Sequence, residues 1–129
     1  MILLDTHVLV WLQQEPRKLS RAAESTIRRA RTTSSLAISC ITIVELATLF
    51  GRGRLQTVGT IEGTIRRFVE EVDVLPVTYK VALATGYLSL DLLPDPMDRI
   101  IAATARTEGI PLVTADERII NCEWIRTIW

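Results

Sequence analysis

The sequence predicts an α/β protein with a mostly parallel central sheet of four to five strands and helices on both faces. Short apolar runs of strand length alternate with amphipathic helical patterns along the whole chain, which is the pattern of strand-helix-strand units. The 129 residues fit a single domain, residues 1–129, which is long enough to bury about two thirds of its unfolded surface. No internal repeat or low-complexity segment indicates another architecture.

The first part of the chain predicts a buried strand followed by two helices. Residues 2–5 are apolar up to a terminal aspartate, and the helix that begins at Thr6 ends before Pro16. Ser20 is placed to cap an amphipathic surface helix over residues 21–31.

The middle of the chain predicts two more strands, each followed by a helix. Residues 36–41 are a second apolar run, and a helical pattern from Thr42 ends at the glycines that begin with Gly51. After a helix over residues 61–69, a third strand over 72–77 is interrupted by a proline near its end. Another helix is expected to begin at the threonine that follows.

The last part of the chain predicts a connector, a helix and a fourth strand. The connector covers residues 88–95, and the helix over 96–108 has proline at its first position and Gly109 just past its end. Residues 111–114 form the fourth strand, and residues 124–129 are a candidate fifth.

Composition and charge limit the classes of function. The 48% hydrophobic and 23% charged residues are typical of a soluble globular protein. Cys40 and Cys122 lack metal-ligand spacing and are expected to be reduced thiols, and no signal or membrane segment is visible, so a cytoplasmic location is expected. Fifteen basic residues balance fifteen acidic ones, so any contact with a polyanion must be local.

Four acids lie where predicted strands give way to helices. They are Asp5, Glu45, Asp98 and Asp116. In an open α/β sheet such junctions face the crevice at the carboxyl ends of the strands, so the four acids can meet. Two charges about 4 Å apart repel by roughly 4 kcal/mol at an effective dielectric near 20, so protonation or a cation must compensate. Mg²⁺ and Mn²⁺ prefer oxygen ligands, which indicates a metal-dependent phosphodiester hydrolase that uses one or two ions.

Each acid also has a local structural explanation. Thr42 and Glu45 have the spacing of a capping box, and Asp95 can cap the helix that contains Asp98. Asp5 can cap the helix at Thr6, and the last acid of the four can begin a turn. The joint position at one sheet edge favours a shared site, with Asp95 as a cap or supporting residue.

Other catalytic patterns are missing or incomplete. His7 lies two residues after Asp5, where a phosphatase with an aspartyl nucleophile would have a second aspartate, and it has no nucleophile partner pattern. No glycine-rich dinucleotide or P-loop motif occurs. A structural or supporting role is therefore expected for His7.

Four segments together resemble the PIN-domain ribonucleases, and more narrowly the VapC toxins of bacterial toxin–antitoxin pairs. They are ILLDTHVLVW, SCITIVELATLFGRGRL, DPMDRIIAATA and PLVTADERI, and they span most of the chain. The resemblance implies that the four acids hold Mg²⁺ or Mn²⁺, that Thr6 and Ser39 line the site, and that the substrate is RNA. It also implies a homodimer that a small antitoxin protein inhibits, without membrane association.

The chain departs from this family pattern near the third motif. Met97 stands where an aromatic residue is expected, and Leu92, Leu93 and Pro94 replace polar or basic residues. One or two of the arginines Arg52, Arg54 and Arg99 are expected to contact the phosphates that flank the scissile one. Two other interpretations stay open: a non-catalytic interaction module whose acids are only caps, and a DNA nuclease with the same metal site.

Overall fold

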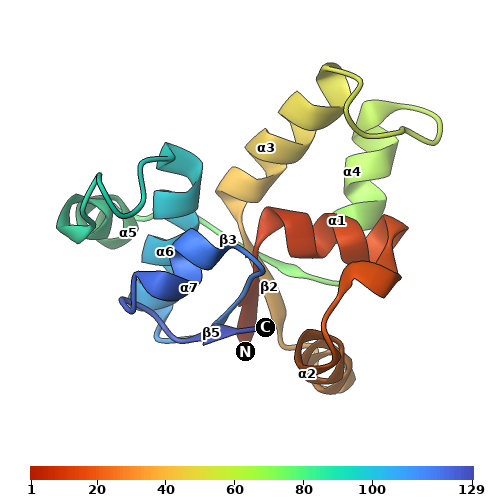
Figure 1. Ribbon diagram of the computed structural model, residues 1–129. Coiled ribbons are helices and arrows are strands. Elements are labelled where there is room, and N and C mark those ends of the chain that lie inside the picture. The colour runs from red at the N-terminus through yellow and green to blue at the C-terminus, as the bar shows by residue number, and fades with distance from the viewer.

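The computed structural model describes all residues from Met1 to Trp129, and its five parallel strands form one sheet between two layers of helices (Figure 1). The strands are β1 (Ile2–Leu4), β2 (Leu36–Ser39), β3 (Asp73–Leu75), β4 (Leu112–Val113) and β5 (Thr127–Ile128). The helices are α1 (Thr6–Gln14), α2 (Arg21–Thr32), α3 (Cys40–Gly51), α4 (Ile61–Val69), α5 (Tyr79–Ala84), α6 (Pro96–Glu108) and α7 (Glu117–Asn121), with the 3₁₀ turns η1 (Pro16–Lys18) and η2 (Thr85–Tyr87). The predicted fold class is confirmed.

The sheet reverses its winding direction at β1. The strand order is β3-β2-β1-β4-β5, and every neighbouring pair is parallel. The chain first builds outward from β1 through β2 and β3, and then returns to the other side of β1 for β4 and β5. Such a reversal leaves a crevice at the carboxyl ends of the central strands, where ligands bind in open α/β sheets. The residues that follow β1 and β4 are therefore directed to one crevice.

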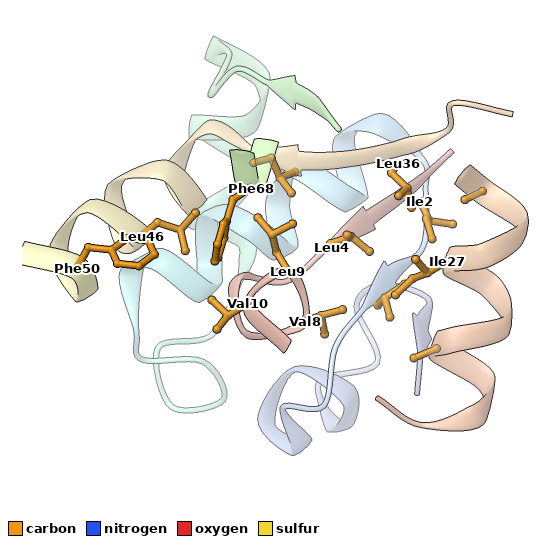
Figure 2. Close-up of a cluster of buried hydrophobic side chains, with 14 residues drawn as sticks. Ile2, Leu4, Val8, Leu9, Val10, Ile27, Leu36, Leu46, Phe50 and Phe68 are labelled. Carbon is orange, nitrogen blue, oxygen red and sulfur yellow. The ribbon is translucent and has the colours of Figure 1, made fainter. Parts of the chain in front are cut away.

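Alternate residues of β1 fill two separate cores, because successive side chains of a strand point to opposite faces. Ile2 and Leu4 join the larger core with side chains from α1, α2, α3 and α4 (Figure 2). Leu3 joins the smaller core, which contains side chains of α6 and α7. Figure 1 shows the same division, with α5, α6 and α7 on one side and α1 to α4 on the other. Both layers hold the carboxyl edge of β1 in place.

Three predicted helix ends are confirmed in atomic detail. The Ser20 side chain accepts a hydrogen bond from the amide of Ala23, and Asp95 accepts from the amides of Met97 and Asp98. Gly109 follows α6 with a φ of 65°, a left-handed conformation that glycine adopts at little cost. Short-range chemistry therefore decides where α2 and α6 begin and where α6 ends.

Three predicted boundaries were wrong. Helix α3 begins at Cys40, two residues before Thr42, because the hydroxyl of Ser39 accepts from the amide of Ile41 and caps the helix. Strand β3 covers only three residues, shorter than predicted, and ends directly before the proline, which has no amide to donate. The turn predicted at Asp116 is the N-cap of the short helix α7. Five residues are too few to show a helical period in sequence.

Both cysteines are free thiols, as predicted. No helix has the length and apolar character that crossing a membrane requires.

Candidate active site

The four acids predicted to form a site lie at the carboxyl edge of the sheet or one to two turns beyond it. Asp5 follows β1 and caps α1, and Asp116 lies beyond β4 and caps α7. Asp98 is in the first turn of α6, and Glu45 is in the second turn of α3. Because β1 and β4 are adjacent and parallel, their carboxyl ends place the first two acids at the same edge.

Electrostatic interactions connect all of these acids. Burial, and after it the negative charges of four neighbours, together raise the pKa of Asp98 to about 7; the neighbours are Asp5, Asp95, Asp116 and Glu45, in that order of effect. Four other carboxylates can raise the pKa of one carboxyl group only when all five lie close together in a poorly solvated region. This crowding is the strongest electrostatic feature of the molecule, and crowded acids are typical of functional crevices.

Asp5 is the most deeply buried of the four, with only 4% of its surface exposed. Burial raises its pKa, whereas hydrogen bonds from Thr114 and Thr6 lower it. The Thr6 amide donates to Oδ1 at 2.7 Å, and the Thr114 hydroxyl donates to Oδ2 at 2.7 Å. Both carboxylate oxygens therefore have fixed donors, which hold the side chain in one orientation.

Glu45 is held by a hydroxyl from another helix. The Thr6 hydroxyl donates to Oε1 of Glu45 at 2.7 Å and lies 3.2 Å from the Thr42 hydroxyl. The carboxylate is the nearer of the two acceptors that the Thr6 hydroxyl faces, and the Thr42 hydroxyl is the second. The capping-box interpretation of Thr42 and Glu45 was wrong, because both side chains are turned toward α1 and Ser39 caps the helix.

Two further predicted residues lie behind the acids. Ser39 is fully buried, and its hydroxyl oxygen lies 3.5 Å from the Thr104 hydroxyl of α6. Asp95 is the N-cap of α6, and its charge raises the pKa of Asp98. Ser39 supports the start of α3, and Asp95 supports the start of α6, so both helices enter the crevice at defined positions.

The three arginines assigned to phosphate contacts lie outside the acid cluster. Arg99 donates to the backbone oxygens of Thr85 and Leu88 at 2.5 and 3.1 Å and to that of Leu93 at 3.4 Å. Its guanidinium therefore holds the connector before α6. Arg52 and Arg54 are exposed just beyond the end of α3, whereas Glu45 lies near its start, about 10 Å away along the helix axis. They remain predictions for RNA bound along that helix.

The comparison with known proteins gives the family. Residues 2–124 match the PIN domain family. The chain belongs to the PIN-domain family. It is 35% identical to Ribonuclease VapC22 of Mycobacterium tuberculosis over 130 aligned residues, which cover 99% of this chain and 98% of the relative. The resemblance predicted from the four sequence segments is confirmed.

Solved structures confirm the PIN fold. VapBC2 from Rickettsia felis, bound to a DNA fragment from its promoter, has a TM-score of 0.75 at 19% identity, over 98% of this chain and 97% of the solved chain. DNA-bound VapBC from Salmonella typhimurium has a TM-score of 0.72 at 24% identity, over 98% and 95% of the two chains. At these identities the likeness shows the fold alone.

The carboxylates of this PIN domain do not form a ready-made metal centre, because no three acidic side chains converge at ligand distance. Asp5 is fixed by two donors, Glu45 by Thr6, and Asp116 by the amide of Arg118 at 2.8 Å. Mutual repulsion also separates unneutralised carboxylates. The donors still fit a hard divalent cation, since Mg²⁺ is usually held by one or two carboxylates and retains several waters.

The site contacts of two hydroxyl residues of this PIN domain, Thr114 and Thr42, were not predicted, and Thr42 was interpreted only as a helix cap. Thr114 bonds to an acid 109 positions away, and Thr42 to a hydroxyl 36 positions away. The one available signal for Thr114 was its place at the end of β4, two residues before Asp116.

The hydroxyl of Thr6 is expected to contribute stability as well as position. Thr6→Val removes the donor to Glu45 and leaves a half-buried carboxylate unpaired, so the free energy of unfolding should fall by about 1–2 kcal/mol at pH 7. Thr6→Ser keeps the hydroxyl and should lose less. Urea unfolding measures both variants. Equal losses for the two variants would show that the methyl group, and not the hydroxyl, matters.

Proposed function

We propose that this PIN domain is a Mg²⁺- or Mn²⁺-dependent endoribonuclease that acts as the toxin of a toxin–antitoxin pair. The observation that supports the proposal best is the carboxylate cluster at the reversal point of the sheet, where the pKa of Asp98 is raised to about 7. A relative that is 35% identical over almost its full length has the name Ribonuclease VapC22. The carboxylate cluster supports metal-dependent hydrolysis, and the name of the relative supports RNA as the substrate.

The roles of the acids follow from their surroundings. Asp5, Glu45, Asp98 and Asp116 would hold the metal, and a bound ion supplies an activated water and neutralises charge on the scissile phosphate. The donors Thr6 and Thr114 keep Asp5 oriented toward the crevice. In the metal-free protein the pKa of Asp98 is raised to about 7, and a bound cation would favour its ionised form, the form that ligates.

The start of α1 adds electrostatic support for an anionic substrate. Its N-terminus carries partial positive charge and lies at the crevice, where it favours a phosphate group. The substrate chain needs this local attraction, because the protein has no net charge.

Metal dependence is tested with purified protein and labelled RNA. We expect cleavage in Mg²⁺ or Mn²⁺, no cleavage in EDTA, and recovery when excess metal is restored. A matched single-stranded DNA of the same sequence separates ribonuclease from deoxyribonuclease activity. Cleavage that continues unchanged in the chelator would rule out the metal mechanism.

Calorimetric titration with Mn²⁺ separates the enzyme from a non-catalytic interaction module and counts the ions. Binding to the wild type, loss of binding in Asp98→Asn, and unchanged binding in the matched control Asp91→Asn would support the proposal. Asp91 is an exposed acid of the connector. If the wild type bound no Mn²⁺ at millimolar concentration, the acids would be caps.

The antitoxin and the second copy of this chain are proposed partners. The solved structures of VapBC2 and VapBC support an antitoxin partner, since both are VapBC assemblies bound to DNA. For self-association, large apolar side chains are exposed on α5 and the connector. They are Tyr79, Leu83, Leu90 and Leu92. Light scattering tests the dimer, and a monomer at high protein concentration would remove it.

A further inference from the structure

A cavity of about 240 Å³ opens directly beside the acid cluster. Its lining combines the carboxylate residues Asp5 and Asp116 with His7, Trp11 and Ala115. Cavities that enclose drug-sized ligands are usually larger, about 300–1,000 Å³. This one can therefore take a single ring system, and its position places that ring next to whatever the carboxylates hold.

Two aromatic rings of α1 line this cavity, and the Trp129 ring packs against one of them. The ring centroids of His7 and Trp11 are 6.1 Å apart, and those of Trp11 and Trp129 are 5.8 Å apart. Trp129 follows β5, which is parallel to β4, so it lies at the same carboxyl edge as the acids. We call His7, Trp11 and Trp129 the aromatic strip. The Lys18 ammonium lies 5.7 Å from the centroid of the Trp11 ring and forms an ion pair with Glu15 at 3.0 Å.

Core packing explains only part of this strip. The other close aromatic pair, Phe50 and Phe68, is 4% and 5% exposed and belongs wholly to the core. In contrast, His7 is exposed, and Trp129 keeps 38% of its surface in solvent. An open cavity with exposed rings beside a crowded carboxylate cluster is the arrangement of a binding site.

We propose that this cavity receives one unpaired nucleobase of a single-stranded RNA, next to the phosphate that the acids engage. The proposal rests on the proposed function and deepens it. Aromatic side chains that stack bases, together with nearby positive charge, are the usual means of binding single strands. A paired base must first be unpaired and unstacked before it can enter a cavity, which costs energy, so the site favours unpaired RNA.

The charge of the protein explains why stacking is needed. Most nucleic-acid binding gains its affinity from Lys and Arg contacts to phosphates, but this chain has no net charge and its cavity has an acidic wall. A neutral base can approach these carboxylates without the repulsion that a phosphate meets. Stacking in the cavity then holds the strand.

Binding is measured by fluorescence anisotropy with a labelled eight-nucleotide RNA in EDTA, where metal-dependent cleavage does not occur. His7→Ala should weaken binding by about tenfold, the usual effect of losing one stacking partner. Trp129→Ala removes the ring that packs against Trp11 and should weaken binding less. Tyr87→Ala is the matched control, because Tyr87 is 82% exposed and lies on η2, on the other side of the sheet. Trp11→Ala removes a ring that packs against the core, so the exposed His7 gives the decisive variant.

A second arm uses eight RNAs that each contain one abasic site. If a base occupies the cavity, one abasic position should weaken binding to the wild type by about tenfold and have little further effect on His7→Ala. The proposal would be overturned if His7→Ala and Trp129→Ala both bound RNA as tightly as the wild type, or if Tyr87→Ala lost as much affinity as they do. The EDTA-sensitive cleavage assay tests the nuclease activity separately. If the protein bound a base in the cavity but did not cleave RNA, the proposed function would be wrong and the base-binding proposal would stand.

Discussion

Asp98→Asn is expected to abolish metal-dependent RNA cleavage and, at the same time, to stabilise the metal-free protein at pH 8. Cleavage should fall by at least about a hundredfold, because the variant loses a carboxylate that would hold the ion, and one ion contributes several kcal/mol of transition-state stabilisation. The stability gain follows from burial and from the four neighbouring charges that raise the pKa of Asp98. Removing a charge from this cluster relieves repulsion that a metal otherwise compensates.

The pH dependence has a defined direction. An unperturbed aspartate releases its proton near pH 3.8, whereas Asp98 in the folded protein holds its proton up to about pH 7. Between these values the folded state binds more protons than the unfolded state, so the free energy of unfolding falls as the pH rises. Allowing for solvent screening of this partly exposed group, the loss contributed by Asp98 between pH 4 and pH 8 should be about 1–2 kcal/mol.

Urea unfolding in EDTA at pH 5 and pH 8 measures this effect. The wild type and the matched control Asp91→Asn should both lose stability between the two pH values, and Asp98→Asn should lose less. At pH 5 the wild type and Asp98→Asn should be similar, since Asp98 is then protonated in the fold. A variant that is less stable than the wild type at pH 8 would show that the first-turn position in α6, where a helix dipole favours an acid, dominates instead.

The helix ends that depend on contacts within a few residues were predicted correctly from the sequence. Ser20, Asp95 and Gly109 end or begin helices through contacts within a few residues, and these positions were predicted correctly. The start of α3 was misplaced because Ser39 and Thr42 are both capping residues in isolation. Thr6 of α1 decides between them, because its hydroxyl forms a buried contact with the Thr42 hydroxyl. No local sequence pattern reveals this contact.

The candidate site was located by topology and incompletely described by sequence. The rule that ligands bind beyond the carboxyl ends of strands brought Asp5 and Asp116 to one edge, and β1 and β4 are indeed adjacent there. The supporting hydroxyl of Thr114 comes from 109 positions along the chain, so its partner depends on the finished sheet. The sequence also shows that Arg99 is positively charged, but it does not show whether the guanidinium faces solvent, where it could contact a phosphate, or binds backbone oxygens.

Arg99→Lys separates these two roles. In the structure the guanidinium of Arg99 donates to the backbone oxygens of Thr85, Leu88 and Leu93, and so joins η2 and the connector to α6. Lysine keeps the charge but has one compact ammonium in place of a planar fork with several donors. Hydrogen bonds from a charged donor contribute about 1.5–3 kcal/mol each, so Arg99→Lys should lower the free energy of unfolding by about 2–4 kcal/mol.

Thermal and urea unfolding measure the loss, and Arg118→Lys is the matched control because that exposed side chain makes no hydrogen bond. A phosphate contact predicts the opposite pattern, in which Arg99→Lys keeps wild-type stability and weakens RNA binding only slightly. A strong loss of stability would mean that Arg99 acts on the site through the backbone before α6, since that backbone carries Asp95 and leads into Asp98. Cleavage should then decrease in Arg99→Lys even under conditions where the variant stays folded.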